Sequence, residues 1–260
     1  MDFMYSVAGA LTGFFVGLTG VGGGALMTPI LLLIFGVSPT TAVATDLWFA
    51  TITKVFALII HHREQQIEWP IVRRLWMGSL PATSVFVIAL LFGVLDGITN
   101  KLLPSIIGVT ILITALGMLI KMRLQNTESL SIFNHLQALK PLQKTLTIIG
   151  GAMLGIMVSL TSIGAGALGS LLLIYLYPSR LTPHKLVGTD IAHAIPLALI
   201  AGLGYLISGH VNTSMLLSML IGSIPAAIIG SLCASRFSQN KLRLCLVTIL
   251  SISGLKLVFI

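Results

Sequence analysis

The nine residues Leu18-Thr19-Gly20-Val21-Gly22-Gly23-Gly24-Ala25-Leu26 recur as Leu160-Thr161-Ser162-Ile163-Gly164-Ala165-Gly166-Ala167-Leu168, with six positions identical. Each copy lies near the middle of an apolar stretch of about 33 residues, 3–35 and 145–177. Such a stretch is too long for one upright membrane span of about 20 residues and too short for two. Glycine costs up to about 1 kcal/mol against alanine in a helix and permits backbone angles that other residues avoid. Both stretches are therefore predicted to be broken helices or re-entrant hairpins.

Further matches follow each copy in the same order, at separations of 140 to 144 residues. The paired segments are Thr45-Asp46-Leu47 with Thr189-Asp190-Ile191, Gly78–Ala82 with Gly222–Ala226, and Asn100-Lys101-Leu102 with Asn240-Lys241-Leu242. An internal repeat of this kind indicates a duplicated architecture. The chain is predicted to consist of a first membrane repeat at 1–120, a cytoplasmic linker at 121–144 and a second membrane repeat at 145–260, each repeat with four helical elements.

Composition places the protein in the bilayer. Of 260 residues, 56% are hydrophobic and 8% are charged, whereas soluble domains carry roughly 25% charged residues. The six ordinary spans are expected at 41–60, 75–95, 102–120, 186–207, 214–233 and 242–260. The first residues lack the basic segment of a cleavable signal peptide. The fold class is therefore all-α integral membrane.

The net charge of +8 does not indicate nucleic-acid binding, because the basic residues are scattered through short loops instead of forming a stripe. Cys233 and Cys245 lie in apolar runs without the spacing of metal ligands. We therefore expect no disulfide, no metal and no cofactor. The expected surroundings are the lipid bilayer and a small solute, and the sequence leaves open whether the protein is a homo-oligomer.

The basic residues also predict a topology. If all eight elements crossed the membrane once, the loops on the two sides would hold seven and six lysines and arginines. If each broken element returns to its own side, twelve lie together and only Lys101 lies opposite. The positive-inside rule then places the twelve in the cytoplasm and both termini outside. The second half enters the membrane from the opposite side to the first, which is an inverted-topology repeat.

The duplicated glycine-rich segment, with Pro29 after its first copy and a Thr-Asp pair after both, resembles the sulfite exporter TauE/SafE family of membrane permeases over essentially the whole chain. The resemblance implies an eight-element transporter of the bacterial inner membrane that handles sulfite, sulfonates and other sulfur-containing organic anions, often as an exporter. The second half departs from the pattern: Ala165 stands opposite Gly23, Gly169 opposite Met27, and no proline stands opposite Pro29.

The helix breaks are candidate anion sites, because the N-terminus of a broken helix offers unpaired N–H groups and the positive end of a helix dipole. The candidate substrate-binding residues are Thr19, Gly22, Gly23, Gly24, Thr161, Ser162, Gly164 and Gly166. Close helix packing is the competing interpretation of glycine. We assign to packing the two seams Gly9, Gly13, Gly17 and Gly222, Ala226, Gly230, Ala234.

Asp46 and Asp190 are candidate coupling residues, since a carboxylate within a span costs about 2.5–3.5 kcal/mol or more. The alternative is that they anchor helix starts at Ser38-Pro39 and Thr182-Pro183. His193, three residues after Asp190, is either a proton relay or a packed side chain. Thr45 and Thr189 are expected to support the aspartates in a second shell. Lys54, near a span end, is expected to snorkel toward the interface.

These features predict a secondary transporter, coupled to an ion gradient, for small sulfur-containing anions such as sulfite or organosulfonates. A passive anion channel would use the same broken helices. An intramembrane aspartyl protease would need its two carboxylates at close range. The inverted repeat opposes that arrangement, because it separates the aspartates by roughly 10 Å of depth in a 30 Å core. The protein is therefore not expected to be an enzyme.

Overall fold

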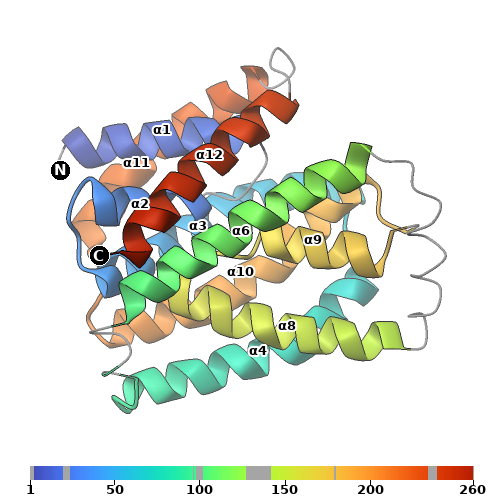
Figure 1. Ribbon diagram of the computed structural model, residues 1–260, viewed down its shortest axis with the longest axis horizontal. Helices are drawn as coiled ribbons and strands as arrows, with labels where there is room; N and C mark the ends of the chain where they lie inside the picture. The colour runs from blue at the N-terminus through green and yellow to red at the C-terminus, as the bar shows by residue number, and fades with distance from the viewer. Residues whose placement is uncertain are drawn as a thin grey trace.

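The computed structural model describes residues 3–19, 24–95, 97, 102–126, 142–178, 180–233 and 239–259. Helices form all of its regular structure, and no strand occurs among these residues (Figure 1). The first half contains α1 (Phe3–Thr19), α2 (Gly24–Leu33), α3 (Pro39–Arg63), α4 (Trp69–Leu91) and α6 (Leu103–Asn126). The second half contains α8 (Gln143–Thr161), α9 (Ala167–Leu176), α10 (Pro183–Ile207), α11 (Thr213–Cys233) and α12 (Gln239–Val258).

Both long apolar stretches are broken where the glycines predict a break. The second is interrupted between α8 and α9, where Ser162, Gly164 and Gly166 have φ angles of 60°, 115° and 135°. A right-handed helix cannot continue through these angles. The first is interrupted between Thr19, the end of α1, and Gly24, the start of α2. Gly20, Val21, Gly22 and Gly23 lie outside the described residues.

Each broken element returns toward the end of the bundle where it began. In Figure 1 the N-terminus and the loop after α2 lie at the left end, whereas the start of α8 and the loop after α9 lie at the right end. The C-terminus also lies at the left. The two broken elements therefore point in opposite directions along the bundle.

The two halves interlock through their broken helices. α1 packs along α11, and α8 packs along α4, so each broken helix contacts the other half of the chain. The central pairs α3·α10 and α6·α12 each join equivalent helices of the two halves. Exchanging the halves therefore maps α1·α11 onto α8·α4, and it maps α3·α10 and α6·α12 each onto itself.

Glycines allow the close approach of α1 and α11. A Cβ at Gly9 or Gly13 would overlap the α11 backbone at Met219 or Ser223. Likewise, a Cβ at Gly222 would overlap the α1 backbone at Ser6. The assignment of these glycine seams to packing is confirmed at Gly9, Gly13, Gly17, Gly222 and Gly230.

The equivalent contact between α8 and α4 follows the same rule. A Cβ at Gly151 or Gly155 would overlap the α4 backbone at Leu75 or Ser79, and one at Gly78 would overlap Ile148. Small residues of this kind let membrane helices pack backbone to backbone. This second interface was not predicted from the sequence.

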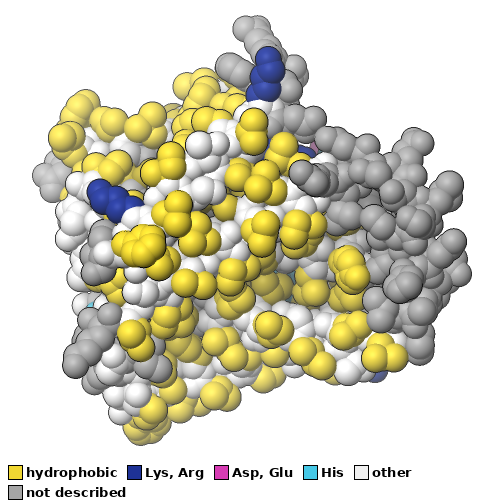
Figure 2. Space-filling view, in the orientation of Figure 1, with side chains coloured by type: hydrophobic (Ala, Val, Ile, Leu, Met, Phe, Trp, Pro, Cys, Tyr) yellow, Lys and Arg dark blue, Asp and Glu magenta, His cyan; other side chains and the backbone are white. Residues whose placement is uncertain are grey.

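Six helices among the described residues are long and apolar enough to cross a membrane: α3, α4, α6, α8, α10 and α11, with α6 counted to Met122. On the face shown in Figure 2, hydrophobic side chains far outnumber charged ones. An apolar exterior of this extent suits contact with lipid, not water. The protein is a multi-pass membrane protein.

Helix ends differ from the predicted spans by several residues. α4 begins at Trp69, six residues before the predicted 75–95, because Pro70 fits the first turn of a helix. α6 extends to Asn126, into the segment predicted as linker. The part of that segment at 127–141 lies outside the described residues.

Candidate functional site

Asp46 and Asp190 lie in equivalent positions on the central helices α3 and α10. The predicted helix starts are confirmed: α3 begins at Pro39, and the Thr182 hydroxyl caps α10 by accepting the Lys185 N–H at 3.4 Å. Each aspartate is thus the eighth residue of its helix. The helix dipole acts mainly within the first turn. Both side chains are buried, so they belong to the helix interface and not to the helix starts.

Asp46 is held by the short helix of its own half. The Thr28 hydroxyl on α2 donates to Asp46 Oδ2 at 2.5 Å. The second oxygen, Oδ1, is buried and has no hydrogen-bond partner. Ser162, at the α8–α9 break, lies near this carboxylate, and its own hydroxyl is also buried and unpaired. The first aspartate therefore lies between the short helix of one half and the helix break of the other.

Asp190 lies against the first turn of α9. Its Oδ1 is so close to Gly169 that a Cβ there would overlap it, and this oxygen has no hydrogen-bond partner. Ser170, the position equivalent to Thr28, accepts a hydrogen bond from Lys121 Nζ at 2.7 Å. Lys121 also interacts electrostatically with Asp190. The second aspartate is therefore stabilised by a cation instead of a hydroxyl.

Lys54 completes what we call the central charged cluster: Asp46, Lys54, Lys121 and Asp190. The expectation that Lys54 snorkels is wrong, since it is 9% exposed and interacts electrostatically with both aspartates. α3 continues to Arg63, so Lys54 lies nine residues, or about 14 Å, before the helix end. Two carboxylates and two ammonium groups balance one another in this cluster, and buried charges need such compensation.

His193 bonds to another helix instead of to Asp190. Its Nε2 lies 3.0 Å from the Ser79 hydroxyl on α4, and its Nδ1 is buried without a partner. Its backbone carbonyl accepts the Trp76 indole N–H at 3.3 Å. These contacts stabilise the packing of α10 against α4.

The two threonines that precede the aspartates differ in their contacts. The Thr189 hydroxyl accepts the backbone N–H of Glu68 at 3.1 Å, at the start of α4. The Thr45 hydroxyl is buried and has no partner. Thr189 therefore supports the loop between α3 and α4, and Thr45 leaves one more buried oxygen near the site.

The residues of the second helix break use part of their hydrogen-bonding capacity locally. Thr161 Oγ1 donates to the Met157 carbonyl at 2.7 Å and accepts the Ile163 N–H at 3.2 Å. The N–H groups of Leu168 and Gly169 both donate to the Gly164 carbonyl, each at 3.1 Å. Ser162 therefore carries the buried hydroxyl at this break that lacks a partner.

The corresponding candidates of the first break are less fully described. Thr19 ends α1 and Gly24 begins α2. Gly22 and Gly23 lie outside the described residues, so the geometry of their N–H groups does not enter the site.

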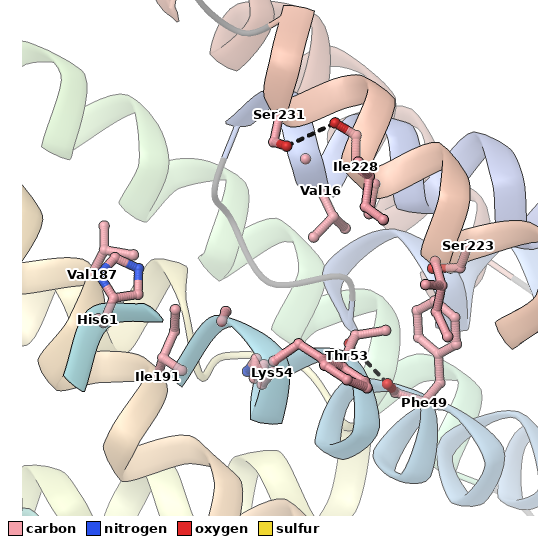
Figure 3. A pocket seen from close by; sticks show the side chains of 15 residues that line it. Val16, Phe49, Thr53, Lys54, His61, Val187, Ile191, Ser223, Ile228 and Ser231 are labelled. Carbon is pink, nitrogen blue, oxygen red and sulfur yellow. Dashed lines mark hydrogen bonds between the residues drawn. The ribbon is translucent and has the colours of Figure 1, made fainter. Parts of the chain in front are cut away.

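A cavity of about 440 Å³ adjoins Lys54 (Figure 3). Four helices from the two halves form it: α1, α3, α10 and α11. Its lining residues are Val16, Gly17, Phe49, Thr53, Lys54, Phe56, Ala57, His61, Val187, Ile191, Ser223, Ile224, Ala227, Ile228 and Ser231. This volume is within the range of small-molecule sites.

Ion pairs join the two halves at the end of the bundle that holds the α3–α4 and α9–α10 loops (Figure 1). Glu68 Oε1 lies 2.7 Å from Lys185 Nζ, and Glu68 Oε2 lies 3.2 Å from Arg180 Nη2. The hydrogen bond from Lys185, with the charges of Lys185 and Arg180, lowers the pKa of Glu68 below its usual value.

Broken helices, buried charges between two halves and a cavity beside them are the features of a membrane transporter. The profile of the family described as Sulfite exporter TauE/SafE matches residues 5–257. The chain belongs to this family. No solved structure matches the chain.

The curated relatives agree with this assignment. The chain is 36% identical over 253 residues to "Probable membrane transporter protein YjnA" of Bacillus subtilis (strain 168), covering 96% of this chain and 97% of the relative. It is 27% identical to a "Probable membrane transporter protein" of Haemophilus influenzae, covering 96% and 90%. These relatives are named as transporters, which favours transport over proteolysis by the two aspartates.

Proposed function

We propose that the protein is a secondary transporter that moves small sulfur-containing anions, such as sulfite or organosulfonates, across the bacterial inner membrane. An ion gradient drives this transport. The central charged cluster carries this proposal. Ionisable side chains inside membrane spans are costly and mark solute or ion pathways. Here they lie on the helices that join the two halves, where transporters of this general design hold their solute.

Charge balance supports coupling to protons. The central charged cluster holds two acidic and two basic side chains, so a bound anion adds one negative charge to a balanced cluster. A proton on Asp190 or Asp46 would restore the balance. Asp190 is the favoured carrier, because Ser170 does not donate to it, whereas the equivalent Thr28 hydroxyl donates to Asp46. His193 also interacts electrostatically with Lys54, so the arrival of an anion at the cluster would change its electrostatic surroundings.

The anionic group of the solute is proposed to lie at the helix breaks. Ser162, Gly164 and Gly166 form the described part of this site, and Thr19, Gly22, Gly23, Gly24 and Thr161 its remaining candidates. The unpaired Ser162 hydroxyl near Asp46 supports this placement, because a buried hydroxyl without a partner is costly. An arriving anion would accept its hydrogen bond.

Inverted topology of the two repeats is part of the proposal. The opposite directions of the broken elements and the exchange of partners between α1·α11 and α8·α4 support it. The basic loops then lie in the cytoplasm and both termini outside. Single cysteines at Arg74 and at Asn212, in a chain lacking Cys233 and Cys245, test this orientation. In intact cells an impermeant thiol reagent should label position 212 and spare position 74, and labelling of both would contradict it.

Transport itself is tested in proteoliposomes. Labelled sulfite, and separately a labelled short organosulfonate, is presented with and without a pH gradient across the membrane. Saturable flux that the gradient accelerates is expected, and Asp190→Asn protein in the same lipid serves as the control. Flux that neither saturates nor responds to the gradient would instead indicate a passive channel.

A further inference from the structure

A few polar side chains and many apolar ones line the cavity beside Lys54. In Figure 3, Phe49, Thr53 and Lys54 follow one another along α3, while Val16, Ile228 and Ser231 lie across the cavity on α1 and α11. Aromatic and aliphatic side chains dominate the remaining lining, with Phe56, Ile191 and Ile224 among them. The cavity therefore offers a single fixed charge within a mostly hydrocarbon surface.

Lys54 provides that charge. Its side chain is nine-tenths buried, and it lines the cavity while interacting with Asp46 and Asp190. No ion pair within 4.0 Å joins Lys54 to a carboxylate among the described residues, since those pairs are formed by Glu68. A mostly buried ammonium that lines a cavity, with no carboxylate in direct contact, can bind the charged group of an anionic ligand there.

We propose, building on the proposed transport function, that this cavity, which none of the described residues of the helix breaks line, binds an amphiphilic organic anion. The charged group of this anion lies on Lys54 and an apolar body of several carbons lies against Phe49, Phe56 and Ile224. The apolar walls determine this preference. A small inorganic anion would lose its hydration and find few donors there, because Thr53, Ser223, Ser231 and His61 are the other polar side chains of the lining. An anion with a hydrocarbon body gains from burying it.

Ser223 adds a second polar contact in the cavity. Its hydroxyl is buried and unpaired, and it lies on α11 opposite the α3 residues. In the other half the equivalent hydroxyl, Ser79, is occupied by His193. Phe49 occupies the position in the first half that is equivalent to His193. An apolar ring therefore replaces the histidine in the cavity, which leaves Ser223 free to bind a ligand.

Two sources share this ligand chemistry: a water-soluble organic anion and an anionic lipid. Binding is measured by calorimetry on protein in nanodiscs of phosphatidylcholine, using ethanesulfonate, butanesulfonate, hexanesulfonate and sulfite. Affinity is expected to rise roughly two- to fourfold per methylene along the sulfonates. Butanol and hexanol, which carry the same apolar bodies without charge, should not bind. Nanodiscs containing phosphatidylglycerol separate the sources: loss of hexanesulfonate binding there assigns the cavity to lipid, and retained binding assigns it to the soluble anion.

Two variants locate the site. Lys54→Met keeps the length of the side chain without its charge and should lower hexanesulfonate affinity at least tenfold. Because that change also unbalances the central charged cluster, Ala57→Phe provides an independent test by narrowing the cavity: it should remove the chain-length dependence while ethanesulfonate still binds. Leu232→Phe, on the exposed surface of α11 outside the lining, should preserve the full dependence.

The outcomes separate this inference from the function on which it rests. Sulfite binding and transport with no dependence on sulfonate chain length would overturn the amphiphilic site and leave anion transport standing. A chain-length dependence that survives Ala57→Phe would place the ligand elsewhere and overturn the cavity. Absence of binding and transport for every anion would overturn both.

Discussion

Asp46 and Asp190 lie at equivalent positions of the two halves, yet their surroundings differ. Asp46 accepts a hydrogen bond from Thr28 on the short helix α2. Asp190 lies against Gly169 on the equivalent helix α9, and the hydroxyl at the matching position, Ser170, is occupied by Lys121. A duplicated fold therefore gives one carboxylate a hydroxyl donor in addition to a nearby cation, and gives the other nearby cations alone.

The repeat alone would give both aspartates the same role. Their different surroundings indicate two different roles. A fixed hydrogen-bond donor stabilises a carboxylate in its ionised form and in one position. A carboxylate stabilised mainly by nearby cations responds when those cations acquire another anion. Asp190 is accordingly the residue expected to exchange protons during transport, and Asp46 the one expected to fix α2 against α3.

The largest expected effect is the loss of coupling in Asp190→Asn. The amide keeps the shape of the carboxyl group but cannot carry a proton. Gradient-driven flux into proteoliposomes should fall to background while anion binding persists. Asp46→Asn should retain measurable gradient-driven flux, because the amide can still bond to Thr28. Equal behaviour of the two variants would remove the distinction between the halves.

The next effect concerns the close approach of Asp190 to α9. Gly169→Ala places a methyl group where Asp190 Oδ1 now lies, so the carboxylate must move. Transport should fall at least tenfold. Gly117→Ala is the matched control, since its new methyl group would meet only the flexible ends of Leu168 and Leu171. Normal transport by well-folded Gly169→Ala protein would show that the contact has no functional role.

Stability, in contrast, should respond alike in the two halves. Gly13→Ala and Gly155→Ala each force a methyl group against an α11 or α4 backbone, at Ser223 and Ser79. Each is expected to cost about 1–3 kcal/mol by overpacking, seen as similarly lowered melting temperatures in detergent. A loss confined to one variant would break the equivalence of the two interfaces.

The smallest effect concerns the ion pairs of Glu68, which occur at one end of the bundle. Because the folded pKa of Glu68 is lowered, its ion pairs stabilise the protein above the unfolded pKa, and that stability is lost as pH falls through the folded pKa. The melting temperature of the wild type should exceed that of Glu68→Gln at neutral pH, with the gap closing below about pH 4. A gap that widens with acid would contradict this sign.

The sequence predicted the features that depend on length and on glycine. The two helix breaks and the packing seam of Gly9 and Gly13 follow from hydrophobicity and from the absence of a Cβ, whereas the predicted span 242–260 is not among the six helices of the described residues that are long and apolar enough to cross a membrane. The helix starts at Pro39 and Pro183 could also be predicted from the sequence, since proline fits the first turn. Such properties are local, and neighbouring residues in the chain determine them.

Features that depend on depth and on contacts between helices were less accessible. Lys54 was expected at an interface because the predicted span ended at residue 60, whereas α3 ends at Arg63 and packs its middle against α10. A lysine eight residues after a buried aspartate was the available signal. The role of Ser170 and Lys121 required α6 and α9 to be placed together, which no sequence pattern states.

Proton uptake on anion binding tests the central claim most directly. An alkyl sulfonate that does not titrate near neutral pH is bound to the purified protein in buffers of different ionisation enthalpy, and calorimetry gives the protons taken up per anion. About one proton is expected for the wild type, and none for Asp190→Asn, which lacks the carboxylate that we expect to take it up. Saturable binding without proton uptake by the wild type would contradict the account, because the central charged cluster would then accept an anion without the compensating charge that we assign to Asp190.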